Sequence, residues 1–214
     1  MYRNDADRMR EKLDQIRALA DSRVTGKDRA AFLAFMEQVF ANAPVDDVTE
    51  PDAEELYGAT LSLWRLGERR DPDEPRVRFY NPRIEEHGWE SGHSVLEIVN
   101  DDMPFLVDSV THHLTDRSLG IHAILHPIVS VRRDAQGRRL DAGETGGSTL
   151  SESVMQIQVD QVGDPARLAE IETSIRTVLA DVRVAVRDWP DMTARLRDAA
   201  RDLKSAKPKG VDRA

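Results

Sequence analysis

The sequence has no cysteine among its 214 residues, which excludes disulfide bonds, thiolate nucleophiles and cysteine-based zinc or iron–sulfur sites. This composition fits a reducing compartment, and we expect the chain in the cytoplasm. Long apolar runs are also missing, because the stretches 94–99 and 121–131 are far shorter than the ~20 residues of a membrane-spanning helix. The first residues lead straight into a charged pattern, without the apolar core of an export signal. We therefore expect neither membrane insertion nor export by this route.

Basic residues are in deficit as well. The chain has 30 lysine and arginine residues against 39 aspartate and glutamate residues, which leaves a formal net charge of -9. Such a surface repels polyanions, so we exclude nucleic acid as a partner. The hydrophobic fraction of 40% is enough for one substantial core with a helical appendage, or for two small domains.

Catalytic motifs are absent too. No G-x-G-x-x-G fingerprint for a dinucleotide occurs, and the glycine-bearing segment 143–148 lacks the lysine of a phosphate-binding loop. All six histidines fall between His87 and His126, but a metal site needs a convergence of ligands that their spacing does not indicate. We expect no catalytic residue, no cofactor-binding residue and no metal ligand in this chain.

Helical periodicity opens the chain. Apolar residues recur at steps of three and four over 7–20 and again over 27–40, and a third helix is predicted from Pro51 to about Arg70 after an acidic loop at 46–50. The second helix carries a wide apolar face that needs a partner surface. We predict an interface there, formed by Phe32, Phe35, Met36 and Phe40.

Strand patterns follow a breaker at 71–75. Alternation over 76–80 predicts a half-exposed strand, and 94–100 predicts an interior one. Asp101 or Asp102 is placed to cap a helix with Pro104 in its first turn, and this helix runs to Leu119. A third strand over 121–131 is jogged at His126, a polar loop spans 134–151, and a fourth strand over 155–159 alternates apolar residues with glutamines. The glutamines of the fourth strand indicate that one face of the sheet is polar and exposed to solvent. We therefore predict that helices lie on one face of the sheet only.

A last long helix is predicted to start at Asp164-Pro165 and to end at 188–190. Residues 182–187 alternate as a strand would, but no breaker precedes them and we favour helix. A separate helix at 192–203 and a linker at 207–210 follow. The predicted divisions are a helical segment at 1–72, a sheet domain at 73–190 and a connecting segment at 191–214. A short heptad pattern predicts a second interface, formed by Ile171, Ile175, Val178 and Val182.

Several segments carry a family resemblance. They are LSLW at 61–64, NPRIEEHGWES at 81–91, LGIH at 119–122, HP at 126–127, DWP at 188–190 and above all EIVNDDMPFLVDSV at 97–110. Together they cover roughly 39–189 and resemble the bacterial large NAD-specific glutamate dehydrogenases. The resemblance implies the first of several ACT-type domains, which are regulatory and precede the dehydrogenase domain. It also implies downstream domains of the same polypeptide and a homo-oligomer as partners, with NAD bound only by the downstream domain.

The fold implied is α+β: N-terminal helices followed by an ACT-like (ferredoxin-like) four-stranded antiparallel sheet with helices on one face. The order of predicted strands and helices suits this fold independently. Two departures from the family pattern stand out. Phe105 occupies a position where the usual ACT turn has glycine, and the final strand is replaced by helix, so that residues 76–80 supply the fourth strand.

The turn before the central helix is the predicted effector site. Backbone amides at a helix start attract a carboxylate, and Asp101 or Asp102 could hold an ammonium group, which together fit an amino acid. The candidate residues are Asn100, Asp101, Asp102, Met103, Pro104 and Asp108. The alternative is that one aspartate caps the helix while the Phe105 ring fills the space. Two functions follow as hypotheses: a regulatory and assembly region that senses an amino acid, or a structural scaffold without a ligand.

Overall fold

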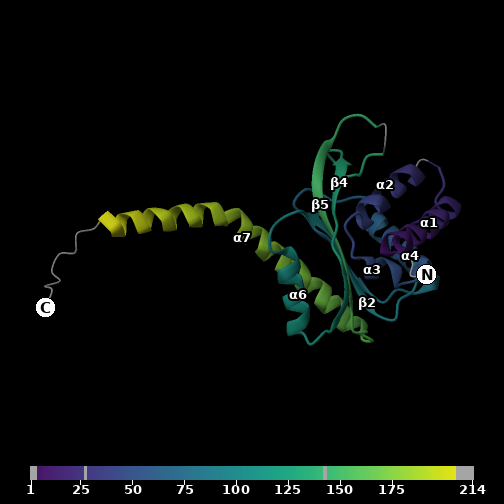
Figure 1. Cartoon of the computed structure of the whole chain (residues 1–214). Helices are drawn as coiled ribbons and strands as arrows, with labels where there is room; N and C mark the ends of the chain where they lie inside the picture. The colour runs from purple at the N-terminus through teal and green to yellow at the C-terminus, as the bar shows by residue number, and fades with distance from the viewer. Residues whose placement is uncertain (1–3, 27, 142–143, 206–214) are drawn as a thin grey trace.

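The computed structural model describes residues 4–26, 28–141 and 144–205. A central antiparallel sheet separates two layers of helices, with α1 to α4 on one side and α6 and α7 on the other (Figure 1). The elements are α1 (Asp5–Arg23), α2 (Asp28–Phe40), α3 (Val45–Thr49), α4 (Ala53–Leu66), β1 (Arg76–Tyr80), α5 (Ile84–His87), β2 (Ser94–Asp101), α6 (Leu106–Asp116), β3 (Ile121–Leu125), β4 (Ile128–Arg133), β5 (Ser148–Val159) and α7 (Pro165–Ser205).

The sheet has the order β1-β2-β5-β3, and β4 also pairs with β5. Since β2 and β3 are both antiparallel to β5, they run parallel to each other, and α6 connects them around the inserted β5. This is the split βαβ arrangement of ferredoxin-like folds, so the predicted fold class is confirmed. The edge beside β2 is taken by β1, which confirms that 76–80 supplies the remaining strand. The jog at 126–127 divides the third strand into β3 and β4, which gives five strands.

One face of the sheet packs against α6 and α7. Alternate residues of β2 and β5, such as Ile98 and Ile157, meet Val110 and Leu114 of α6 and Ile175 of α7 in one buried cluster. Period-two alternation in the strands and the apolar stripe of each helix produce this layer. The two helices of the ACT-like part therefore share one face of the sheet, as predicted.

The opposite face is covered as well, which corrects the prediction that helices lie on one face only. Val99, Val131 and Val154 of the sheet belong to the same buried cluster as the apolar residues of α1, α2 and α4. Buried polar residues on this face are paired: Arg78 donates to Glu97, and Gln156 Nε2 lies 3.2 Å from a Glu97 carboxylate oxygen. The polar alternation in the strands therefore marks an internal network and not a wet surface.

Several element boundaries differ from the sequence predictions. The expected acidic loop at 46–50 contains α3, and the expected loop at 134–151 already becomes strand at Ser148. The third helix ends at Leu66 and not at Arg70, because Gly67 follows as its C-cap. Short helices and strand ends carry too few residues for periodicity to locate them. The start predicted at residue 27 and the linker at 207–210 lie outside the described residues.

The last helix is continuous over 41 residues. Asp164 Oδ1 accepts from the Ala166 amide at 2.9 Å, so the predicted start is confirmed, and residues 182–187 are helical as favoured. The predicted helix end at 188–190 is wrong, because Pro190 lies inside the helix. The predicted division at 191 falls within α7 and stays a prediction. A proline removes one backbone hydrogen bond and bends a helix without always ending it, and Figure 1 shows α7 changing direction beyond the sheet.

Candidate functional site

The end of β2, where an effector was predicted, is held by two arginines. Arg183 Nη2 donates to Asn100 Oδ1 at 2.7 Å, and its Nη1 donates to Asp101 Oδ2 at 2.8 Å. Arg70 Nη2 donates to Asp101 Oδ1 at 2.6 Å. We call these four residues the arginine junction. It ties together the segment after α4, the central strand and α7, which are far apart in sequence.

A buried carboxylate continues the arginine junction. Glu152 of β5 accepts from Arg70 Nε at 2.7 Å and from Arg133 Nε and Nη2 at 2.7 and 2.8 Å. Each of the three residues is at most 4% exposed. Burial alone would raise the pKa of Asp101, but hydrogen bonds from Arg70 and Arg183 outweigh it and hold that pKa below its ordinary value. Asp101 is therefore charged, and both Asp101 and Glu152 are paired with guanidinium groups.

The other predicted effector residues lie around the start of α6. Both Asp102 and Pro104 are exposed, while Met103 is half-buried against the core under α6. Asp108 is exposed and lines an open groove between α6 and α7 together with Phe105 and Asp181. No aspartate side chain caps α6, so the capping alternative is wrong: Phe105 is the N-cap residue, with a left-handed backbone. Asn100 and Asp101 are thus committed to the arginine junction, and Asp102 and Asp108 face solvent.

Phe105 has a backbone conformation that glycine favours. Its φ is 69°, and 55% of the residue is exposed, so its ring adds little packing. Side chains other than glycine are strained in this region. We expect Phe105→Gly to stabilise the chain by about 0.5–1 kcal/mol, measured as a higher urea midpoint. Phe79→Gly, a buried strand position, serves as the opposite control, and an equal loss of stability in both variants would contradict the assignment of strain.

The predicted interface residues are core residues of this chain. Phe32, Phe35, Met36 and Phe40 are at most 5% exposed and pack α2 against α1, α4 and the sheet. On α7 the buried residues are Ile171, Ile175, Leu179 and Val182, with Val178 half-buried beside them. Both predicted surfaces are therefore used within the chain, where the sheet itself is the partner. An interface of these residues with another subunit or domain stays a prediction.

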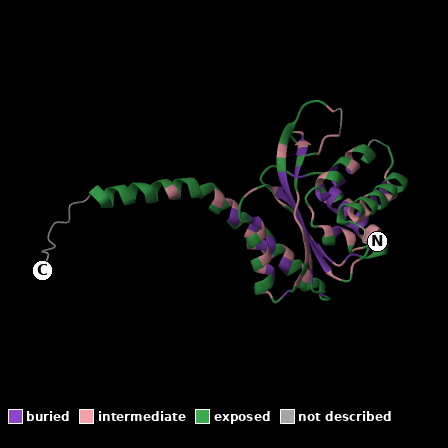
Figure 2. Cartoon of the chain, viewed as in Figure 1, coloured by how far each residue is buried: buried purple, intermediate pink, exposed green. Residues whose placement is uncertain are grey.

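Exposed apolar side chains occur further along α7. Figure 2 shows the buried residues concentrated between the sheet and the helices, whereas the projecting half of α7 is almost wholly exposed. The large apolar residues there are Val184, Trp189, Met192, Leu196 and Leu203, each between 46% and 79% exposed.

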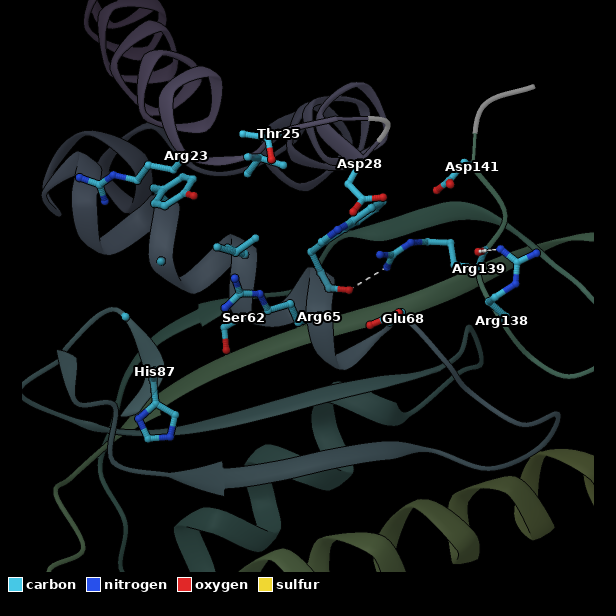
Figure 3. A pocket seen from close by; sticks show the side chains of 16 residues that line it. Arg23, Thr25, Asp28, Ser62, Arg65, Glu68, His87, Arg138, Arg139 and Asp141 are labelled. Carbon is cyan, nitrogen blue, oxygen red and sulfur yellow. Dashed lines mark hydrogen bonds between the residues drawn. The ribbon is translucent and has the colours of Figure 1, made fainter. Parts of the chain in front are cut away.

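A polar pocket lies on the other side of the sheet, beside α4. It has a volume of about 640 Å³ and is bordered by the end of α1, the start of α2, α4, residues 87–88 and residues 138–141. Figure 3 shows four arginines around it, Arg23, Arg65, Arg138 and Arg139. Neither composition nor periodicity indicated this pocket, because its walls come from five separate segments.

Arg139 is the unusual residue of this pocket. Its Nη1 donates to the Trp64 carbonyl oxygen at 2.8 Å, and its guanidinium carbon lies 3.0 Å from the centre of the Trp64 ring. Among the described residues, no carboxylate lies within ion-pair distance of Arg139. Burial, followed by the positive charge of Arg133, lowers the pKa of Arg139 to about 9. The group is a largely desolvated cation without a direct counter-charge.

The histidines are dispersed over separate contacts. His113 lies 2.8 Å from the Ser174 hydroxyl, His122 lies 2.8 Å from an Asp160 oxygen, and His126 lies 2.7 Å from the Ser153 hydroxyl. Within residues 4–26, 28–141 and 144–205, no group of three histidine or acidic side chains is arranged to hold a metal ion. In the same part of the chain, no helix combines the length and the apolar character that crossing a bilayer requires.

Comparison with known proteins places this fold and these residues in a family. Residues 35–175 match the family model described as glutamate dehydrogenase, ACT1 domain. The NAD-specific glutamate dehydrogenase of Halomonas elongata is 40% identical over 204 residues, which is 94% of this chain and 13% of that protein. The Pseudomonas aeruginosa protein of the same name is 41% identical over 178 residues, or 82% of this chain and 11% of the relative.

A more distant relative gives the same result. The NAD-specific glutamate dehydrogenase of Mycobacterium tuberculosis is 30% identical over 145 residues, covering 66% of this chain and 9% of its own length. The chain thus spans only a small fraction of the curated relatives that it matches. The family model covers well over half of the 214 residues, including all five strands and α6. The chain therefore belongs to the glutamate dehydrogenase ACT1 domain family.

Proposed function

We propose that this chain is a non-catalytic regulatory and assembly region of an NAD-specific glutamate dehydrogenase. In this proposal other parts of the polypeptide bind NAD and oxidise glutamate to 2-oxoglutarate and ammonia. The family match, the small share of each relative that is covered, and the lack of a dinucleotide fingerprint support it. The purified chain, incubated with glutamate and NAD, should form no NADH above a protein-free blank. Formation of NADH would overturn the proposal.

The arginine junction is the observation that carries the regulatory part. Arg183 is only 26% exposed at its side chain and bonds both Asn100 and Asp101, so the position of α7 depends on the end of β2. A regulatory coupling requires contacts that differ between two states, and charge-assisted hydrogen bonds in a partly desolvated place are strong enough to bias such states. The exposed apolar residues of α7 beyond the sheet supply a surface for contact with other domains or subunits.

Arg183→Gln in the full-length enzyme tests the coupling. We expect the half-saturating glutamate concentration or the cooperativity to change about fivefold, since couplings between sites are typically 1–3 kcal/mol. Arg187→Gln is the matched control, because Arg187 lies one turn later and, among the described residues, bonds only its neighbour Asp188. Initial rates against glutamate concentration, with the oligomeric state checked by light scattering, give the measurement. Identical kinetics for both variants and the unmodified enzyme would contradict regulation through α7.

A structural scaffold without an effector is the second candidate function. It is favoured by the commitment of both Asp101 oxygens to guanidinium groups, which leaves Asp102 and Asp108 as the exposed carboxylates near the turn. Calorimetric titration with a panel of amino acids separates the two. Saturable heat that Asp102→Asn or Asp108→Asn removes supports an effector at the turn, and the absence of such heat supports the scaffold.

A further inference from the structure

Four arginines and the carboxylates of Asp28, Glu68 and Asp141 line the pocket beside α4. What is unusual is that two of the arginines have no ion-pair partner among the described residues. Arg23 is paired with Glu54 through two hydrogen bonds of 2.6 Å, and Arg138 is paired with Glu144 at 3.0 and 3.1 Å. Arg65 and Arg139 have no such partner among the residues that the structure describes. Two of the four arginines are therefore available to an additional anion.

The lack of an ion-pair partner at Arg139 costs the folded chain stability. A guanidinium that leaves water needs a counter-charge or a full set of acceptors, and Arg139 has one carbonyl and the Trp64 ring. The charges of Glu68 and Asp141 act on it from a longer distance and offset only part of the cost. In Figure 3 the Arg139 side chain reaches from the 138–141 segment toward α4, beside Asp28 and Glu68. An anion in the pocket would complete its coordination.

We propose that this pocket binds a small metabolite whose carboxylate or phosphate group is held by the guanidinium group of Arg139, while Arg65 contacts another part of the ligand. Arginine presents a planar set of donors that matches both anions. The volume of about 640 Å³ lies in the range of small-molecule sites. Asp28 and Glu68 also line the pocket, which favours a ligand that carries hydroxyl groups or other donors beside its anionic group. The inference concerns binding by this chain alone and does not rest on the regulatory proposal.

Calorimetric titration of the chain at constant ionic strength tests the site, with malate and inorganic phosphate as probes. We expect saturable one-site binding of at least one probe, weakened about tenfold or more by Arg139→Gln and about threefold or more by Arg65→Gln. Arg197→Gln is the charge-matched control, because Arg197 is exposed on α7 beyond the sheet. Binding of malate alone assigns a carboxylate ligand, binding of phosphate alone assigns a phosphate, and binding of both assigns the shared anion chemistry.

Two results would overturn the proposal. The first is no saturable heat with either probe, or equal affinity in Arg65→Gln, Arg139→Gln and the unmodified chain. The second concerns stability: removing a cation kept for a ligand should leave the thermal midpoint of ligand-free Arg139→Met unchanged or higher. A midpoint lowered by several degrees would show that Arg139 holds α4 in place. Because Arg65 is exposed, its variant keeps the binding test valid even if Arg139 variants fold poorly.

Discussion

Glu152→Gln is expected to destabilise the chain by about 3–5 kcal/mol, because it leaves two buried guanidinium groups without their shared counter-charge. Glu152 is 1% exposed and receives three hydrogen bonds from Arg70 and Arg133. Glutamine keeps the shape but offers one acceptor oxygen and no charge. The loss should appear in urea unfolding at neutral pH as a lower midpoint with an unchanged slope.

Two further variants make this expectation sharper. Asp198→Asn removes an exposed carboxylate that, within the part of the chain that the structure describes, pairs only with Arg201 one turn away on α7, and it should cost no more than about 0.5 kcal/mol. Replacing Arg70, Arg133 and Glu152 together by methionine should recover much of the loss, since apolar side chains of similar volume need no counter-charge. A loss below about 1 kcal/mol for Glu152→Gln would mean that water reaches the two arginines.

Phe32→Ala is expected to cost about 3–5 kcal/mol, the range for removing a fully buried aromatic ring. Phe32 is 0% exposed, and its ring meets those of Tyr57 and Trp64 edge to face, each at 6.0 Å between centroids. The measurement is thermal and urea unfolding of the chain by itself. Such a loss without any partner present would establish that the apolar face of α2 belongs to the core.

The control for Phe32→Ala is the same substitution at a phenylalanine that lies on the surface. Phe105→Ala removes a ring of the same size from a residue that is 55% exposed, so it should change stability by less than about 0.5 kcal/mol. If Phe32→Ala were equally mild but altered assembly of the full-length enzyme, the face of α2 would contact another subunit after all.

Periodicity located the long elements because each of them buries one stripe or one face. The apolar spacing of α2, α4 and α6 and the alternation in β1 and β5 follow from the packing of their apolar residues in the two buried clusters. It did not reveal that both sheet faces are covered. Gln156 looks like a solvent-facing residue in sequence, yet it is buried because Glu97 accepts its hydrogen bond. Arg78 and Tyr80 donate to the same Glu97 carboxylate.

The candidate sites were harder to predict for a similar reason. The turn at 100–108 was predicted from the start of a helix and the aspartates beside it, but the arginines that pair with Asp101 lie 31 and 82 positions away in the sequence. Arg139 lies in a segment predicted only as a loop, and its contact with Trp64 spans 75 positions. Interactions over such separations leave no local pattern in the sequence, so they can be identified only in the folded structure. Phe105 is a partial exception, because the sequence showed that it replaces the glycine of the usual ACT turn, while its left-handed backbone became evident only in the structure.

The length of α7 turns a small motion into a large one. From Val182, its last buried residue, to Ser205 the helix rises through about 35 Å, at roughly 1.5 Å per residue. If the buried half tilted by about 10°, the far tip would swing through about 6 Å, which exceeds one helical turn. A small rearrangement at the sheet would therefore move the far end of α7 by a large distance. That distance is enough for the end of α7 to exchange one set of contacting residues for another.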